Sequence, residues 1–172
     1  MAVKYYSGFC LRGEDELFKA YLDNSDFTIA GFSYGAIKAI QEALAIDTRV
    51  DRLQLFSPAF FNNKDDKFKR MQMMFFAKDS LKYIENFLQN SSYPSDIDLS
   101  YYLKEDGALE LKELLYYMWN QDEIRALIKK GTIIEVYLGE IDKIIDVYAA
   151  KEFFIECGCE VYFIKDVGHI LS

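Results

Sequence analysis

Short apolar segments alternate with amphipathic ones along most of this chain. The apolar segments are rich in β-branched and aromatic residues and stand before Gly, Ser or Pro, which is typical of buried strands. The amphipathic segments repeat apolar side chains at helical spacing. The pattern therefore predicts a parallel sheet covered by helices. The expected strands are residues 3–6, 27–30, 53–56, 133–138 and 161–164.

Three helices are expected to connect successive strands as right-handed crossovers. They are predicted at residues 14–22, 34–45 and 147–156. In the second of them, Ile37, Ile40 and Leu44 recur at the spacing that puts side chains on one helix face.

The segment 59–130 departs from this alternation, because its pattern is helical and contains no convincing strand. We interpret it as a helical cap inserted between the third and fourth strands. One amphipathic stretch, 67–89, is rich in Met and Phe, and another covers 109–119. A Ser-Ser-Tyr-Pro-Ser turn at 91–95 separates them. Residues 1–172 are thus predicted to form one domain with a cap.

Composition narrows the possible functions. The 172 residues are 51% hydrophobic, enough for one domain with a sizeable core. A net charge of −8 argues against binding to nucleic acid or an anionic membrane, and no apolar run approaches the roughly 18 residues of a membrane span. Three cysteines without paired zinc spacing, and no secretory signal, predict a reduced, cytoplasmic setting.

The most informative motif is Gly31-Phe32-Ser33-Tyr34-Gly35, which matches G-x-S-x-G. It stands between an expected strand and an expected helix, where a sharp turn exposes the serine hydroxyl and the glycines allow close backbone approach. This context predicts that Ser33 is a catalytic nucleophile. The alternative is a glycine-rich turn that carries an incidental serine.

A nucleophilic serine requires a general base and an acid that orients it. His169 is the single histidine, and it follows the last expected strand. Asp142, in the loop after the fourth strand, is the preferred acid, and Asp146 is next. Glu140 lies in the same loop, and Asp166 lies close to His169.

Acyl transfer also needs hydrogen-bond donors for the oxyanion of the tetrahedral intermediate. We expect the backbone N–H of Tyr34, after the nucleophile, and that of Phe9, in the loop after the first strand. The alternative for Ser7-Gly8 is an ordinary turn. Cys10 is discounted as a rival nucleophile, because nothing in its local sequence lowers its thiol pKa. Cys157-Gly-Cys159 is too weak a pattern to assign a metal, and no cofactor is expected.

Together these residues resemble the α/β-hydrolase superfamily, and more closely the small pimeloyl-[acyl-carrier protein] methyl ester esterases of biotin synthesis. The resemblance covers nearly the whole chain. Its motifs are Ser-Gly-Phe at 7–9, the elbow with its Ala-Ile-Lys-Ala-Ile extension at 31–40, Leu-Phe-Ser-Pro at 55–58, Phe-Lys-Arg-Met-Gln at 68–72, and the Gly-x-x-Asp and His loops.

The resemblance implies a trimmed α/β-hydrolase fold. Superfamily members have eight strands ordered 1-2-4-3-5-6-7-8, and the five strands here would correspond to 3, 5, 6, 7 and 8, which remain contiguous. Two departures stand out. Ser7-Gly8 replaces the customary His-Gly, and the usual last helix after His169 is absent from the sequence. The second departure predicts that His169 lies on an end that frays.

The resemblance further implies a serine esterase that hydrolyses the methyl ester of pimeloyl-[acyl-carrier protein], with methanol as the second product. The implied partner is an acidic acyl carrier protein. Residues 64–82 contain six Lys or Arg and three Asp, so this part of the cap is basic in an acidic chain. The expected docking residues are Lys64, Lys67, Lys69 and Arg70. A solvated helix face is the alternative explanation of these charges.

Two other functions stay open at this point. One keeps the three catalytic residues and changes the substrate to another small ester or an acyl thioester. The other is a catalytically silent module of the same fold that binds an acyl or protein ligand, since fold alone does not establish activity.

Overall fold

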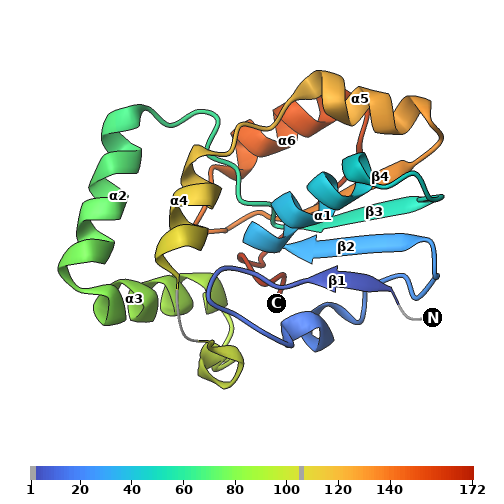
Figure 1. The fold of residues 1–172 in the computed structure, drawn as a ribbon. Helices are drawn as coiled ribbons and strands as arrows, with labels where there is room; N and C mark the ends of the chain where they lie inside the picture. The colour runs from blue at the N-terminus through green and yellow to red at the C-terminus, as the bar shows by residue number, and fades with distance from the viewer. Residues whose placement is uncertain (1–2, 105–106) are drawn as a thin grey trace.

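The centre of the molecule is a five-stranded parallel sheet with strand order β1-β2-β3-β4-β5 (Figure 1). The computed structural model describes residues 3–104 and 107–172. The expected strands and their contiguous order are confirmed, with bounds that shift by at most two residues. The strands are β1 Lys4–Tyr6, β2 Thr28–Phe32, β3 Arg52–Phe56, β4 Ile133–Gly139 and β5 Glu160–Ile164.

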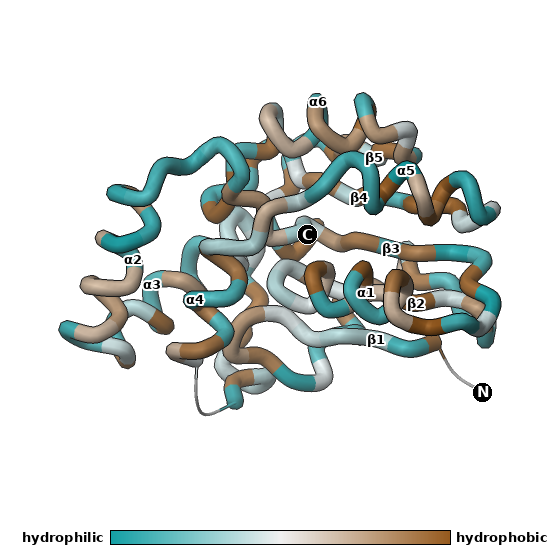
Figure 2. The backbone as a smooth tube through the Cα atoms, turned by 45° about the horizontal axis from the view of Figure 1, so that its top comes forward, coloured by the Kyte–Doolittle hydropathy of each residue, from teal (hydrophilic) through white to brown (hydrophobic). Residues whose placement is uncertain are grey.

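Helices α1 (Tyr34–Ala45), α5 (Gln121–Lys129) and α6 (Val147–Cys157) cover one face of the sheet. Figure 2 shows these helices nearer the viewer than the strands, with hydrophobic residues recurring along them and along β3. Because side chains alternate along a strand, Leu53 and Leu55 pack under these helices, whereas Phe56 belongs to a second apolar cluster. There Phe56 stacks on Phe18, with ring centroids 4.9 Å apart.

The helix expected at 14–22 is wrong in length and type. The structure has a short 3₁₀ helix, η1 (Glu14–Phe18), followed by turns. The side chain of Gln54, on β3, accepts a hydrogen bond from Asp23 N and donates one to the carbonyl of Tyr21, at 2.8 and 2.9 Å. These bonds hold the backbone against the sheet, so a longer helix does not form.

The segment between β3 and β4 is helical. Helices α2 (Asp66–Lys78), α3 (Ser80–Ser92), η2 (Leu99–Tyr102) and α4 (Ala108–Tyr116) lie beyond the carboxyl ends of the strands (Figure 1). By contrast, α5 contacts α1 and α6, so it belongs to the layer that covers the sheet. The stretch expected at 67–89 is two helices. Asp79 separates them, because its N–H ends α2 on Phe75 O while its carboxylate caps α3 at Lys82 N.

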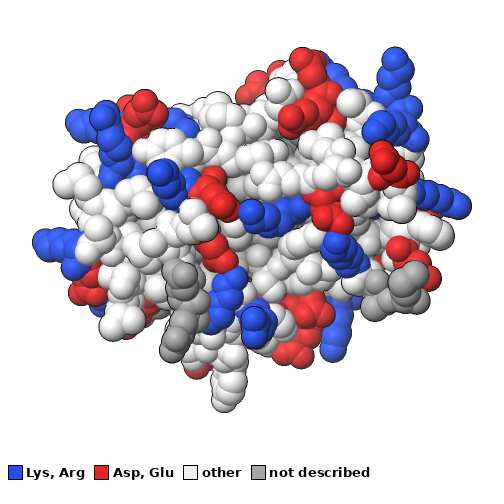
Figure 3. Space-filling view, in the orientation of Figure 1, with Lys and Arg blue, Asp and Glu red and all other residues white. Residues whose placement is uncertain are grey.

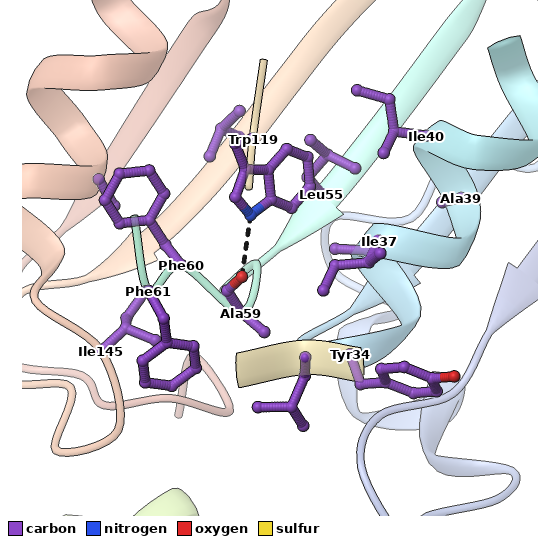
Figure 4. Packing of buried hydrophobic residues seen from close by; sticks show 14 of the residues in the cluster. Tyr34, Ile37, Ala39, Ile40, Leu55, Ala59, Phe60, Phe61, Trp119 and Ile145 are labelled. Carbon is purple, nitrogen blue, oxygen red and sulfur yellow. Dashed lines mark hydrogen bonds between the residues drawn. The ribbon is translucent and has the colours of Figure 1, made fainter. Parts of the chain in front are cut away.

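The chain returns from the helical insertion to the core at Trp119. Its indole Nε1–H donates to the carbonyl of Ala59 at 2.9 Å, as Figure 4 shows. Its ring meets Phe154 of α6 edge to face, with centroids 5.2 Å apart. The chain therefore re-enters the sheet layer beside the point where it left. No helix in the described ranges is long and apolar enough to cross a membrane.

Two glycines set the spacing of β1, β2 and α1. A Cβ added to Gly35 would lie 2.0 Å from the carbonyl oxygen of Tyr6, and one added to Gly31 would lie 2.2 Å from that of Gly35. Side chains at these positions are therefore excluded by backbone rather than by movable side chains.

We expect Gly35→Ala to lower the free energy of unfolding by about 3 kcal/mol, because overpacking forces the backbone apart. Gly13→Ala is the matched control: its φ is 76°, but a Cβ there meets nothing within 4 Å, so the loss should be about 1 kcal/mol. Urea denaturation measures both. Equal losses would contradict the steric explanation.

Candidate active site

Ser33 occupies a strained turn between β2 and α1. Its φ of 53° and ψ of −114° lie outside the regions that residues with a side chain favour. The turn is held by hydrogen bonds from Ser33 N to Phe56 O at 2.9 Å and from Ala59 N to Ser33 O at 3.1 Å. The backbone conformation is that of a nucleophile elbow, which presents the serine hydroxyl above the end of the sheet.

His169 connects Ser33 to Asp142. Its Nε2 lies 3.0 Å from Ser33 Oγ, and its Nδ1 lies 2.5 Å from Asp142 Oδ2. This is the order of contacts in which a histidine takes the serine proton while a carboxylate fixes the imidazole tautomer. The side chains of His169 and Asp142 are both fully buried.

The expectation that His169 frays is wrong. The Ser57 hydroxyl donates to the carbonyl of His169 at 2.5 Å, and Ile170 N donates to Ser91 O at 3.3 Å. Ile170 and Leu171 are buried in the second apolar cluster. These contacts fix the loop that carries His169. Nothing in the sequence around Ser57 or Ser91 predicts them.

Asp142 is the carboxylate that the structure brings to His169. Its Oδ1 accepts from Ile144 N and Ile145 N, at 2.6 and 3.1 Å, so its second oxygen is directed at the imidazole. The alternatives are engaged elsewhere. Asp146 caps α6 at Ala149 N, and Glu140 accepts from Asp166 N.

The loop after β1 is organised by Glu14, which sequence reasoning missed. Glu14 is fully buried, and its Oε1 accepts from Gly8 N at 2.7 Å and from the hydroxyl of Tyr5 at 3.1 Å. Burial and the neighbouring Glu14 carboxylate raise the pKa of Tyr5 well above its usual value, so the hydroxyl stays a donor. The only sequence signal was an acid at the start of an expected helix, where solvent exposure is the usual outcome.

The N–H groups around Phe9 are engaged on both sides. Gly8 N donates to Glu14, Cys10 N donates to Glu110, and Leu11 N turns back to Gly8 O. Within residues 3–104 and 107–172, neither Phe9 N nor Tyr34 N donates a hydrogen bond to a protein acceptor. Tyr34 N opens the first turn of α1, where helical N–H groups point outward. Both expected oxyanion donors thus keep an N–H for a ligand.

A cavity of about 720 Å³ contains Ser33 and Phe9 in its wall. Apart from Ser33 its buried lining is apolar, and apart from Phe75 its exposed lining is polar, so we infer an apolar inner end and a mainly polar mouth. The buried apolar residues are Phe9, Ala59, Phe61, Leu111, Leu114, Leu115 and Ile145; the exposed polar ones are Asp79, Lys82, Asn86, Asn90, Lys143 and Asp146.

No family model matches the sequence, and no curated protein matches it. Solved structures do match. One described as an N-acyl homoserine lactone degrading enzyme is 13% identical, with a TM-score of 0.71, over 98% of this chain and 86% of that one. MenH from S. aureus is 14% identical, with a TM-score of 0.65, over 99% and 88%.

A carboxylesterase from Bacillus subtilis, CesB, is 17% identical, with a TM-score of 0.59. It is matched over 92% of this chain and 58% of its own length, so the present chain spans little more than half of that enzyme. At these identities the likeness is one of fold. Together with the parallel sheet and the elbow, it establishes that this chain has the α/β-hydrolase fold.

We expect Asp142→Asn to slow covalent labelling of Ser33 by a fluorophosphonate about 10⁴-fold, because the amide no longer stabilises the imidazolium or its working tautomer. Asp146→Asn is the matched control, since asparagine caps a helix as well as aspartate does. Its labelling rate should equal that of the wild type. A comparable loss in the control would remove Asp142 as the preferred acid.

Proposed function

We propose that this protein is a serine hydrolase that cleaves carboxylic esters. The observation that carries the proposal is the contact series Ser33–His169–Asp142 at the wall of an apolar cavity. A surface serine in an ordinary turn has neither a histidine within hydrogen-bond distance nor a carboxylate behind that histidine.

In this mechanism Ser33 Oγ attacks the ester carbonyl while His169 Nε2 takes its proton. The N–H groups of Phe9 and Tyr34 stabilise the oxyanion of the tetrahedral intermediate. His169 then returns the proton to the departing alcohol, which leaves an acyl-enzyme. Water, deprotonated by the same imidazole, releases the acid and regenerates Ser33. Asp142 stabilises the imidazolium in both halves.

We further propose that the substrate is the methyl ester of a pimeloyl chain carried on an acyl carrier protein. The proposal is supported by the sequence resemblance and by the form of the cavity. Its apolar inner lining suits a methylene chain, and its polar mouth suits the amide-rich phosphopantetheine arm. Selectivity for the distal ester over the thioester would follow from threading the chain until its far end reaches Ser33.

The outer face of α2 supports docking of an acidic partner. Lys67, Arg70, Met71 and Met74 recur at helical spacing, and all four are exposed. An exposed apolar strip between cations is suited to an acidic helix with some apolar side chains. In Figure 3, Lys and Arg side chains stand at the end of the molecule where Figure 1 places α2.

Two of the four expected docking residues need qualification. Lys69 is removed from the set: it is 5% exposed, with Nζ 3.8 Å from Met118 Sδ and 5.6 Å from the centre of the Tyr116 ring. It sits inside the cap and cannot meet a partner. Lys64 is half-buried and lines the mouth of the cavity, where its ammonium lies over Phe68.

The substrate proposal is tested by intact mass. After incubation with wild-type protein, the mass of the carrier-linked methyl ester should fall by that of one methylene group. The thioester to the carrier protein should remain intact. Ser33→Ala and His169→Ala should leave the carrier unchanged. Release of the carrier thiol would instead indicate a thioesterase. An unchanged carrier with Ser33 still labelled by a fluorophosphonate would mean another ester substrate, and no labelling would favour a silent binding module.

Docking is tested by reversing charge on the outer face of α2. We expect Lys67→Glu with Arg70→Glu to lower kcat/KM for the carrier-linked ester about tenfold at low salt, because rim charges set the association rate. Hydrolysis of a small free ester should not change. Lys129→Glu with Lys130→Glu, on exposed residues at the end of α5, is the matched control. Equal turnover by both double variants, without salt dependence, would contradict docking on α2.

A further inference from the structure

Helix α4 carries two carboxylates that accept hydrogen bonds from two different segments outside the helical insertion. Glu110 and Glu113 are one helical turn apart, so they lie on the same side of α4. Glu110 Oε2 accepts from the backbone N–H of Cys10 at 2.9 Å. Glu113 Oε2 accepts from the hydroxyl of Tyr34, at the start of α1.

The two partners of these carboxylates stand beside the two proposed oxyanion donors. Cys10 directly follows Phe9, and Tyr34 is itself the residue after Ser33. One helix therefore fixes both the loop after β1 and the first turn of α1.

Each carboxylate forms an ion pair with a lysine, which helps to hold it in place. Lys104 Nζ pairs with Glu110, and Lys38 Nζ lies 2.9 Å from Glu113 Oε2. Hydrogen bonds from Tyr34 and Lys38 lower the pKa of Glu113, and burial together with the Glu113 bond raises the pKa of Tyr34 to about 12. Across the neutral range Tyr34 is thus the donor and Glu113 the acceptor.

The adjacent face of α4 lines the cavity. Leu111, Leu114 and Leu115 are buried in its wall, in the same cavity as Ser33. The start of α4 also packs closely on the loop after β1, since a Cβ on Gly107 would lie 2.4 Å from Cys10 Sγ. A chain that fills the cavity would press on the helix that holds both donors.

We propose that Glu110 and Glu113 are positioning residues, and that α4 acts as a brace that sets the distance between the two halves of the oxyanion hole. The inference rests on the proposed esterase function and deepens it. The cap is then more than a cover for the acyl chain, because its last helix adjusts the geometry of the chemical step. A small misplacement of preorganised donors is enough to cost a large part of the rate.

The test uses Glu110→Met and Glu113→Met, which keep helix propensity and side-chain length but remove the acceptor. On a small activated ester we expect kcat to fall about tenfold for each and about a hundredfold for the pair, with KM within twofold of wild type. Affinity for a trifluoromethyl ketone, which forms a tetrahedral adduct on Ser33, should fall in step with kcat. Affinity for the product acid should not change.

Three further variants separate positioning from stability. Tyr34→Phe removes one bond while keeping the backbone N–H and the fold, and it should reproduce the kcat loss of Glu113→Met. Glu113→Gln keeps an acceptor oxygen and should restore most of kcat. Lys112→Gln changes an exposed charge on the same helix, between the two carboxylates, and should match the wild type.

Wild-type kcat in the Glu110→Met, Glu113→Met pair would overturn the brace, as would a rise in KM with kcat unchanged. Failure of the proposed function has a different signature. In that case the wild type itself neither turns over the ester nor reacts with a fluorophosphonate, and no catalytic role is left for α4. If a fluorophosphonate labels the wild type and the Glu110→Met, Glu113→Met double variant at equal rates, the positioning role of α4 is contradicted and the proposed function is not.

Discussion

The approach of α1 to the carboxyl end of β1 is the constraint on which the site depends. It brings Gly35 so close to the carbonyl of Tyr6 that no side chain fits between them. The chain then has to turn sharply between β2 and α1, and Ser33 takes the strained backbone conformation that this turn requires. Hydrogen bonds to Phe56 O and from Ala59 N hold the backbone of Ser33 in this conformation.

The partners of Ser33 come from loops that meet because parallel strands end at one edge of the sheet. Asp142 follows β4 and His169 follows β5. Their loops pack without side chains between them, since a Cβ on Gly139 would lie 2.2 Å from the carbonyl oxygen of Gly168. Ser57, which follows β3, donates a hydrogen bond to the carbonyl of His169 and so fixes its backbone. The loops after β3, β4 and β5 therefore each place one residue of this contact network at the same edge of the sheet.

The insertion between β3 and β4 adds what the sheet cannot supply. It closes an apolar cavity over Ser33, and α4 provides both part of the wall and the two carboxylates that reach Cys10 and Tyr34. On the outside, α2 turns cations and two methionines to solvent. The cavity wall, the proposed partner surface and the contacts beside the proposed oxyanion donors thus all involve one helical segment, while the loops of the sheet layer hold the three proposed catalytic side chains.

Local patterns in the sequence were sufficient to predict the five strands and the elbow, whereas the contiguous strand order followed from the family resemblance. Each of these features can be recognised from neighbouring residues in the sequence. They are the apolar runs of the strands, the glycines around Ser33, and the single histidine after the last strand. Asp142 was the preferred acid among several, and the hydrogen bonds from Ile144 N and Ile145 N are what direct it at His169.

The contacts between residues that are far apart in the sequence depend on how the segments pack in three dimensions. Gln54 ends the helix expected after Gly13, Glu14 turns inward to hold the loop before Phe9, and Lys69 is buried although its neighbours are exposed. Glu110 and Glu113 look like ordinary surface acids in the sequence, and their partners Cys10 and Tyr34 lie 100 and 79 positions away, respectively. No local pattern encodes such pairs, because a hydrogen bond depends on where two segments meet and not on the residues beside either of them.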